Sequence, residues 1–163
     1  MNAPIPTPKL NTAGPAIAVQ TVRSPGGVEA WLVEEHSLPL IAVDFAFDGG
    51  ASRDPENAAG SAYLISGLLD EGAGDLDAEA FQGRMADHAI SLGFDARRDD
   101  FHGYLQTLST HRDTAFDLLG LALNKPRFDA DAVARVRAQI IAGLQRQAKN
   151  PEVMCRNALY AAA

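Results

Sequence analysis

The chain has 163 residues, 47% of them hydrophobic and 21% charged, which is enough for one domain with a hydrophobic core. Its 21 Asp and Glu outnumber its 14 Lys and Arg, and the formal net charge of -7 argues against a nucleic-acid-binding protein and against binding to an anionic membrane surface. The single cysteine, Cys155, excludes an intrachain disulfide and a zinc cluster of several cysteines, and we expect a buried or inert thiol there. No apolar run is long enough to span a bilayer.

The first part of the chain predicts a flexible segment followed by three strands. Residues 1–16 are rich in Pro, Ala, Thr and Asn, which is typical of a flexible lead-in. Strands are expected around residues 17–23, 28–35 and 40–47, because apolar side chains alternate there with polar or smaller ones. In the third strand, one face carries four apolar residues: Ile41, Val43, Phe45 and Phe47.

Helical and strand patterns then alternate in pairs. A helix is expected from residue 58 to about 71, and a second over residues 77–89 with Asp77 as its N-cap. Strand patterns return in residues 91–98 and 101–109. In the latter strand, Leu105 and Thr107 are expected on the opposite face from their alternate neighbours Tyr104, Gln106 and Leu108.

The last third of the sequence predicts only helices. They are expected over residues 111–124 and 129–149, with a final segment running to residue 163, and prolines at 126 and 151 separate them. The order of elements predicts an α+β fold, with an antiparallel-rich sheet and helices packed on one face. The chain ends within a helical pattern that has no capping signal, so we expect a lobe truncated at the C-terminus.

Residues 28–74 resemble the start of the peptidase M16 family, which includes insulinase, pitrilysin and the mitochondrial processing peptidase. The similarity is carried by the passage from Phe47 through Gly49, Gly50 and Pro55 to Gly60, where a strand ends in two glycines before a helix. Further on, residues 92–96 are similar to the family's glycine followed by an Asn-Ala strand, and residues 114–128 to its leucine-rich helix and N-x-P-x-F passage. The resemblance covers about residues 18–163, so residues 17–163 are interpreted as an M16-like N-terminal lobe, an incomplete one.

In active members of the family, the helix after the glycines carries H-x-x-E-H, which places two zinc-binding histidines and a general base on one helix face. A glutamate from a later helix completes the site. Here the histidine positions hold Tyr63 and Gly67, and the position of the base holds Ser66. The two acidic positions of the later helix hold Val136 and Gly143. The resemblance therefore implies no catalytic residue and no metal ligand in this chain, and Gly67 is expected to cost about 1 kcal/mol inside the helix.

The resemblance also implies a role. The expected function is that of a non-catalytic subunit or domain, which shapes a peptide-binding chamber with a zinc-bearing H-x-x-E-H partner in a heterodimer, or with a second copy of itself. Zinc is then expected only in the partner. A scaffold of the core-protein type, with no proteolytic role, is the alternative, and an active metalloendopeptidase is a third possibility. Bacterial members of the family leave both the periplasm and the cytoplasm open as compartments.

One strand is a candidate for binding the peptide substrate, and an ordinary strand of the sheet is the alternative. In active relatives, the strand equivalent to residues 92–98 pairs with extended substrate through its main chain, which does not depend on side chains. The resemblance therefore assigns substrate binding to four consecutive residues: Phe94, Asp95, Ala96 and Arg97. Asp95 stands where the family usually has asparagine.

Two weaker groups of side chains are compatible with other sites. None of the four histidines is spaced three or four residues from another, although His102 is near Asp99 and Asp100, and His88 is near Asp87. Solvent-exposed histidines at the ends of elements are the simpler interpretation. An acidic cluster follows the first predicted helix and indicates either a turn or a weak cation site: Asp70, Glu71, Asp75 and Asp77.

Overall fold

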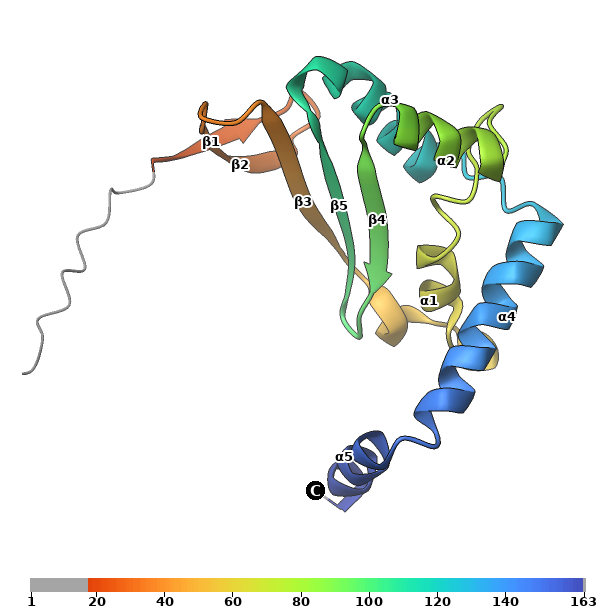
Figure 1. Ribbon diagram of the computed structural model, residues 1–163. Coiled ribbons are helices and arrows are strands. Elements are labelled where there is room, and N and C mark those ends of the chain that lie inside the picture. The colour runs from red at the N-terminus through yellow and green to blue at the C-terminus, as the bar shows by residue number, and fades with distance from the viewer. Residues whose placement is uncertain (1–17, 163) are drawn as a thin grey trace, which may run out of the picture. The chain divides into compact units, whose positions relative to one another are not determined.

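The computed structural model describes residues 18–162, which separate into two compact units. The expected flexible segment 1–16 lies outside the described residues. The first unit ends at Leu38 and contains an antiparallel hairpin of β1 (Val19–Arg23) and β2 (Glu29–Val33) (Figure 1). The second unit begins at Pro39 and contains all the remaining elements.

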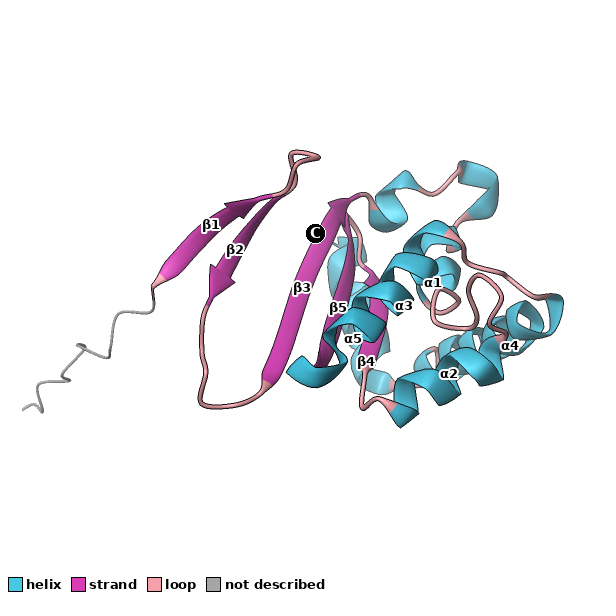
Figure 2. Cartoon of the chain, turned by 90° about the horizontal axis from the view of Figure 1, so that it is seen from above, coloured by secondary structure: helices cyan, strands magenta, loops and turns pink. Residues whose placement is uncertain are grey.

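The second unit is built on a three-stranded antiparallel sheet. Its strands are β3 (Leu40–Asp48), β4 (Ser91–Ala96) and β5 (Asp100–Leu108), arranged in the order β3-β5-β4 (Figure 2). The last strand in sequence is therefore the central one. Within the described sheet, β3 and β4 are the two edges, and each pairs only with β5.

Five α-helices complete the second unit, and they correspond to the predicted ones. They are α1 (Ser61–Ser66), α2 (Ala78–Asp87), α3 (Arg112–Asn124), α4 (Ala130–Gln147) and α5 (Pro151–Ala162). As predicted, Asp77 caps α2, because its carboxylate accepts a hydrogen bond of 2.9 Å from the N–H of Ala80. Within residues 18–162, none of the helices has the length and apolar character needed to cross a bilayer.

The hydrophobic core lies on one face of this sheet. Leu92 of β4 and Leu105 of β5 are register partners, and both are buried against helical side chains. Those side chains come from α2 and α3 and include Phe81, Met85 and Leu118. The structure thus confirms the α+β fold with an antiparallel sheet and helices packed on one face.

The first helix is much shorter than predicted. The expected helix over residues 58–71 is reduced to α1, which ends at Ser66, and Gly67 is its C-cap with φ -83° and ψ 1°. The N–H of Leu68 bonds to the carbonyl of Ile65 at 2.9 Å, a tightened last turn from which the chain leaves the helix axis. The penalty expected for a glycine inside the helix is therefore wrong, because Gly67 stands at the helix end.

Candidate functional site

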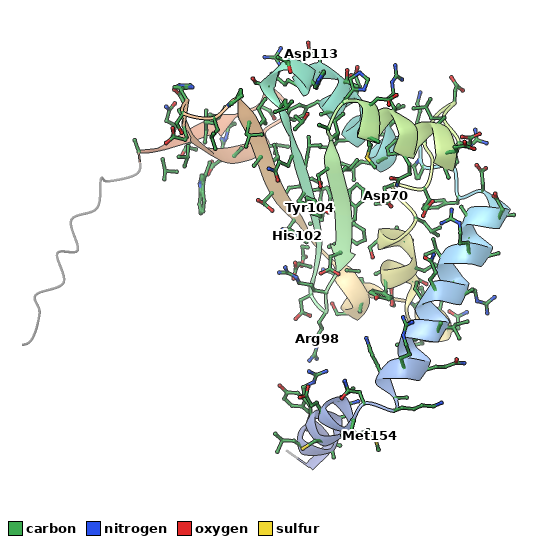
Figure 3. The ribbon with its side chains drawn as sticks, in the orientation of Figure 1. Asp70, Arg98, His102, Tyr104, Asp113 and Met154 are labelled. Carbon is green, nitrogen blue, oxygen red and sulfur yellow. The ribbon has the colours of Figure 1, made fainter. Side chains whose placement is uncertain are left out.

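A groove of about 1010 Å³ runs between α1, α4 and the free edge of β4. All of its lining residues belong to the second unit. The five positions that the family alignment singled out all line it: Tyr63, Ser66, Gly67, Val136 and Gly143. Figure 3 labels Asp70, in the segment after α1, and Tyr104 on β5, which line the groove as well. Segments up to 80 residues apart in the sequence thus meet around one groove.

The glycine-rich passage after β3 anchors the chain to the β4–β5 turn. Three main-chain N–H groups donate to carbonyls of that turn at 2.7 to 3.0 Å: Gly49 to Asp99, Ala51 to Arg97 and Ser52 to Arg98. Gly50 is buried among these contacts with φ 77°, and a Cβ there would lie 2.8 Å from the carbonyl oxygen of Asp100. Only glycine combines this backbone conformation with so close an approach.

Asp54 then fixes the start of α1. Its carboxylate accepts hydrogen bonds from the N–H groups of Gly60 at 2.6 Å and Ala62 at 2.8 Å, two of the donors that a helix N-terminus leaves without partners. The residues that carry the family resemblance in this passage are therefore structural. They hold α1 beside the free edge of β4.

Gly67 stands at the aligned position of the second histidine, and packing against α4 leaves little room for a side chain there. An added Cβ on Gly67 would lie 3.1 Å from Cγ1 of Val136, so the end of α1 touches α4 directly. Val136 is only 5% exposed and forms a small core with Leu68 and Ala132. Gly67 and Val136, two of the aligned positions, are therefore packed directly against each other.

The remaining aligned positions offer no chemistry for hydrolysis. The hydroxyl of Ser66 is buried and donates to the carbonyl of Tyr63 at 2.9 Å, and a serine cannot serve as a carboxylate base. Tyr63 is 49% exposed, and its phenol is not among the imidazole, thiolate and carboxylate groups that ordinarily bind zinc. The residues at these positions do not fit a zinc ion, and the described part of the chain has no group of three His, Cys, Asp or Glu that could hold a metal.

The acidic residues after α1 have separate structural roles. Glu71 binds Arg135 of α4 through both oxygens, at 2.8 and 2.7 Å, and these hydrogen bonds lower the pKa of Glu71. Burial raises the pKa of neighbouring Asp70, whose main-chain carbonyl accepts from the side chain of Gln82 at 2.9 Å. Since Asp77 caps α2, these roles favour the interpretation of the segment as a structured turn over a cation site.

The free edge of β4 presents main-chain groups to the groove. The N–H of Arg97 donates to the carbonyl of Asp100 at 2.9 Å, which places a hydrogen-bonded pair at the β4–β5 turn. Bonded and non-bonded pairs alternate along an antiparallel ladder, so every second residue of β4 turns its N–H and C=O away from β5. These outward-facing residues are Leu92, Phe94 and Ala96.

The four expected substrate-binding residues are placed differently from one another. Phe94 and Asp95 line the groove, whereas Ala96 and Arg97 do not. Arg97 follows the end of β4, and its carbonyl already accepts the N–H of Ala51 at 2.8 Å. The structure therefore centres the open edge on residues 92–95, two residues earlier than the sequence indicated.

Sequence reasoning did not identify Tyr104, which reaches the groove from β5. Its ring lies across Gly93, its register partner on β4. The available signal was a glycine in a predicted strand, which often marks a close approach of another group. The strand that supplies this group depends on register, and the sequence pattern did not define the register.

The histidines lie outside the groove lining. Nε2 of His102 is 3.6 Å from Oδ1 of Asp44 on β3, whereas Asp99 and Asp100 were the expected neighbours. Nδ1 of His88 is 2.9 Å from the carbonyl of Arg84, and its ring is 5.0 Å from that of His111. Cys155 is exposed on α5, which excludes the buried state and leaves the inert one of the two expected states.

Comparison with known proteins places this geometry in a family. The family described as insulinase, peptidase family M16, matches residues 32–163. The non-peptidase homolog YmxG of Helicobacter pylori is 34% identical over 111 residues, which are 68% of this chain and 26% of that protein.

Two solved structures are similar as well. The peptidase M16 inactive domain from Pseudomonas fluorescens has a TM-score of 0.79 at 29% identity, over 88% of this chain and 35% of that one. A protease from Helicobacter pylori has a TM-score of 0.69 at 17% identity, over 85% and 33%, which shows the fold alone. The chain spans about a quarter to a third of the length of the proteins it matches.

Proposed function

Because the chain belongs to the insulinase family, peptidase family M16, we propose that it is a non-catalytic member which shapes a peptide-binding chamber together with a zinc-bearing partner. The partner is a subunit whose helix carries H-x-x-E-H and supplies the zinc. One observation carries the proposal: the groove keeps an open strand edge on one wall, while all five aligned positions lack a metal ligand or base. The names of two relatives, a non-peptidase homolog and an inactive domain, support the non-catalytic part.

The open edge supports binding of an extended peptide. A peptide added beside β4 would bond to the outward N–H and C=O groups of Leu92, Phe94 and Ala96, and such pairing needs no particular side chain. The opposite wall is formed by α4 and is mixed in character. Val136, Ile140 and Leu144 face the groove at helical spacing, and the polar residues Gln139, Arg146 and Gln147 line it as well. A loss of the zinc ligands leaves both of these walls intact.

Peptide binding separates this proposal from the alternative of a scaffold with no proteolytic role. The test uses the full chain and a set of fluorescent, unstructured peptides, with binding measured by anisotropy. Two versions of a bound peptide are compared, one N-methylated on its odd-numbered amides and the other on its even-numbered amides. One version should lose binding and the other should bind nearly as before, because only one set of amides faces β4. Absence of binding by every peptide, or equal binding of both methylated versions and the unmodified peptide, would favour the scaffold.

The catalytic part is tested with the partner. The chain alone is expected to leave peptides intact with or without added zinc, whereas addition of an H-x-x-E-H family member from the same source should produce cleavage that a chelator stops. The matched control is the partner alone, which should cleave more slowly than the pair. Chelator-sensitive cleavage by this chain alone would refute the proposal.

A further inference from the structure

The side chain of Tyr104 crosses from the central strand to the edge strand of the sheet. Leu105 and Thr107 of β5 are both buried, so Tyr104, which precedes Leu105, faces the opposite side of the sheet from the core helices. Its register partner is Gly93 on β4. A Cβ added to Gly93 would lie 2.6 Å from Cε1 of the ring and 2.8 Å from both Cζ and the hydroxyl oxygen.

These contacts define how the ring is held. The phenol end of Tyr104 lies over the backbone of Gly93, in space that any other residue at position 93 would occupy. The side chain is still 43% exposed, and it lines the groove. Gly93 therefore positions an aromatic face at the free edge of β4, beside the place where an added strand would lie.

A peptide strand paired with β4 would meet this ring with one particular side chain. Directly opposed residues of neighbouring strands send their side chains to the same face of a sheet, with Cβ positions about 4.5–5.5 Å apart. The peptide residue opposite Gly93 therefore lies on the same face as Tyr104 and next to its ring. Two residues further along this face, the carboxylate of Asp95 lies 3.5 Å from Nε of Arg97, so the two charges offset each other there.

Resting on the proposed peptide binding, we propose that Tyr104, held over Gly93, is a specificity-determining residue that stacks against an aromatic side chain of the bound peptide. The ring supplies a fixed, half-exposed aromatic face, and offset or edge-to-face contacts between aromatic rings are favourable beyond the area they bury. Gly93 acts as a positioning residue.

The test uses the full chain and a peptide that binds it, with Phe, Leu, Ala or Lys placed at each position in turn. The wild-type protein is expected to prefer Phe over Ala at one position by about three- to tenfold, from the usual strength of an aromatic pair. Tyr104→Ala should bring the ratio between the Phe and Ala peptides to about one, whatever its effect on the affinity for the Ala peptide. Tyr104→Phe should keep it, and Gly93→Ala should weaken it by displacing the ring.

Gln106→Ala is the matched control, since Gln106 is exposed on the same face of β5 and does not line the groove. It should leave the preference unchanged. If Tyr104→Ala keeps the wild-type ratio between the Phe and Ala peptides, or if Lys is preferred at that position, the role of Tyr104 is refuted while peptide binding stands. If no peptide binds the wild-type chain, both proposals fail together.

Discussion

Gly67 and Val136 form a direct contact between the end of α1 and α4. A Cβ on Gly67 would lie 3.1 Å from Cγ1 of Val136, closer than side chains normally pack. The backbone of Gly67 is in a conformation open to any L-residue, so space and not backbone strain makes glycine favourable here. Gly67, at one of the aligned histidine positions, is thus part of a helix–helix contact.

This contact predicts a coupling between two substitutions. Gly67→Ala should be neutral or destabilising in the wild-type protein, because overpacking offsets the gain from a less flexible unfolded chain. In a Val136→Ala background, the same change should stabilise the protein by about 0.4–1 kcal/mol, since the obstructing methyl group is gone. Urea unfolding of the four proteins measures the coupling free energy.

Ala62→Gly in both backgrounds is a useful control, because it changes α1 away from Val136 and should show no coupling. Equal effects of Gly67→Ala in the two backgrounds would contradict a direct contact between positions 67 and 136.

At the scale of elements, the two carboxylates after α1 affect stability in opposite directions. The pKa of Glu71 is lowered by its hydrogen bonds to Arg135, so its stabilising effect is present above about pH 4.5 and is lost as the pH falls through the lowered value. The pKa of Asp70 is raised by burial, so its contribution is full below about pH 3.8 and is lost as the pH rises through the raised value.

Substitution at each position should therefore have an opposite sign at neutral pH. Glu71→Gln is expected to destabilise the protein at pH 7 by about 1 kcal/mol, because it breaks the link between the α1 segment and α4. Asp70→Asn is expected to stabilise it. Both differences should shrink toward pH 3, as measured by urea midpoints between pH 7 and 3, and two changes of the same sign at pH 7 would contradict this account.

For the molecule as a whole, restoring the residues of an active site should not be enough to restore the site. A variant with Tyr63→His, Ser66→Glu, Gly67→His and Gly143→Glu carries the family's residue types, but its new histidine at position 67 must enter space that Val136 fills. We expect less than one zinc ion per chain by mass spectrometry, and a loss of about 1–3 kcal/mol of stability from overpacking.

Adding Val136→Ala to this variant should raise the zinc content, because it opens the space between α1 and α4. Zinc bound at one ion per chain with Val136 in place would show that the packing is no obstacle, and that only the missing ligands prevented binding.

Most secondary structure could be read from the sequence because its signals are local. The alternation of Ile41, Val43 and Phe45 predicts one buried strand face, and the side chain of Asp77 starts α2 where it was expected. The end of α1 was misjudged, because the apolar spacing continues past Ser66 although the chain does not remain helical. That apolar stretch instead places Leu68 in a core with α4, a contact that depends on residues far along the chain.

The sequence by itself determined the order and type of the elements, and it determined that Tyr63, Ser66, Gly67, Val136 and Gly143 cannot supply zinc ligands or a base. The first conclusion follows from periodicity. The second follows from the resemblance to the M16 family, which points to these five positions, together with the chemistry of their side chains. Only the tertiary structure decided that β5 is the central strand, that β4 keeps an open edge at the groove, and that Tyr104 lies over Gly93. Those features arise from strand register and from close packing between distant segments, and neither leaves a mark in the local pattern of the chain.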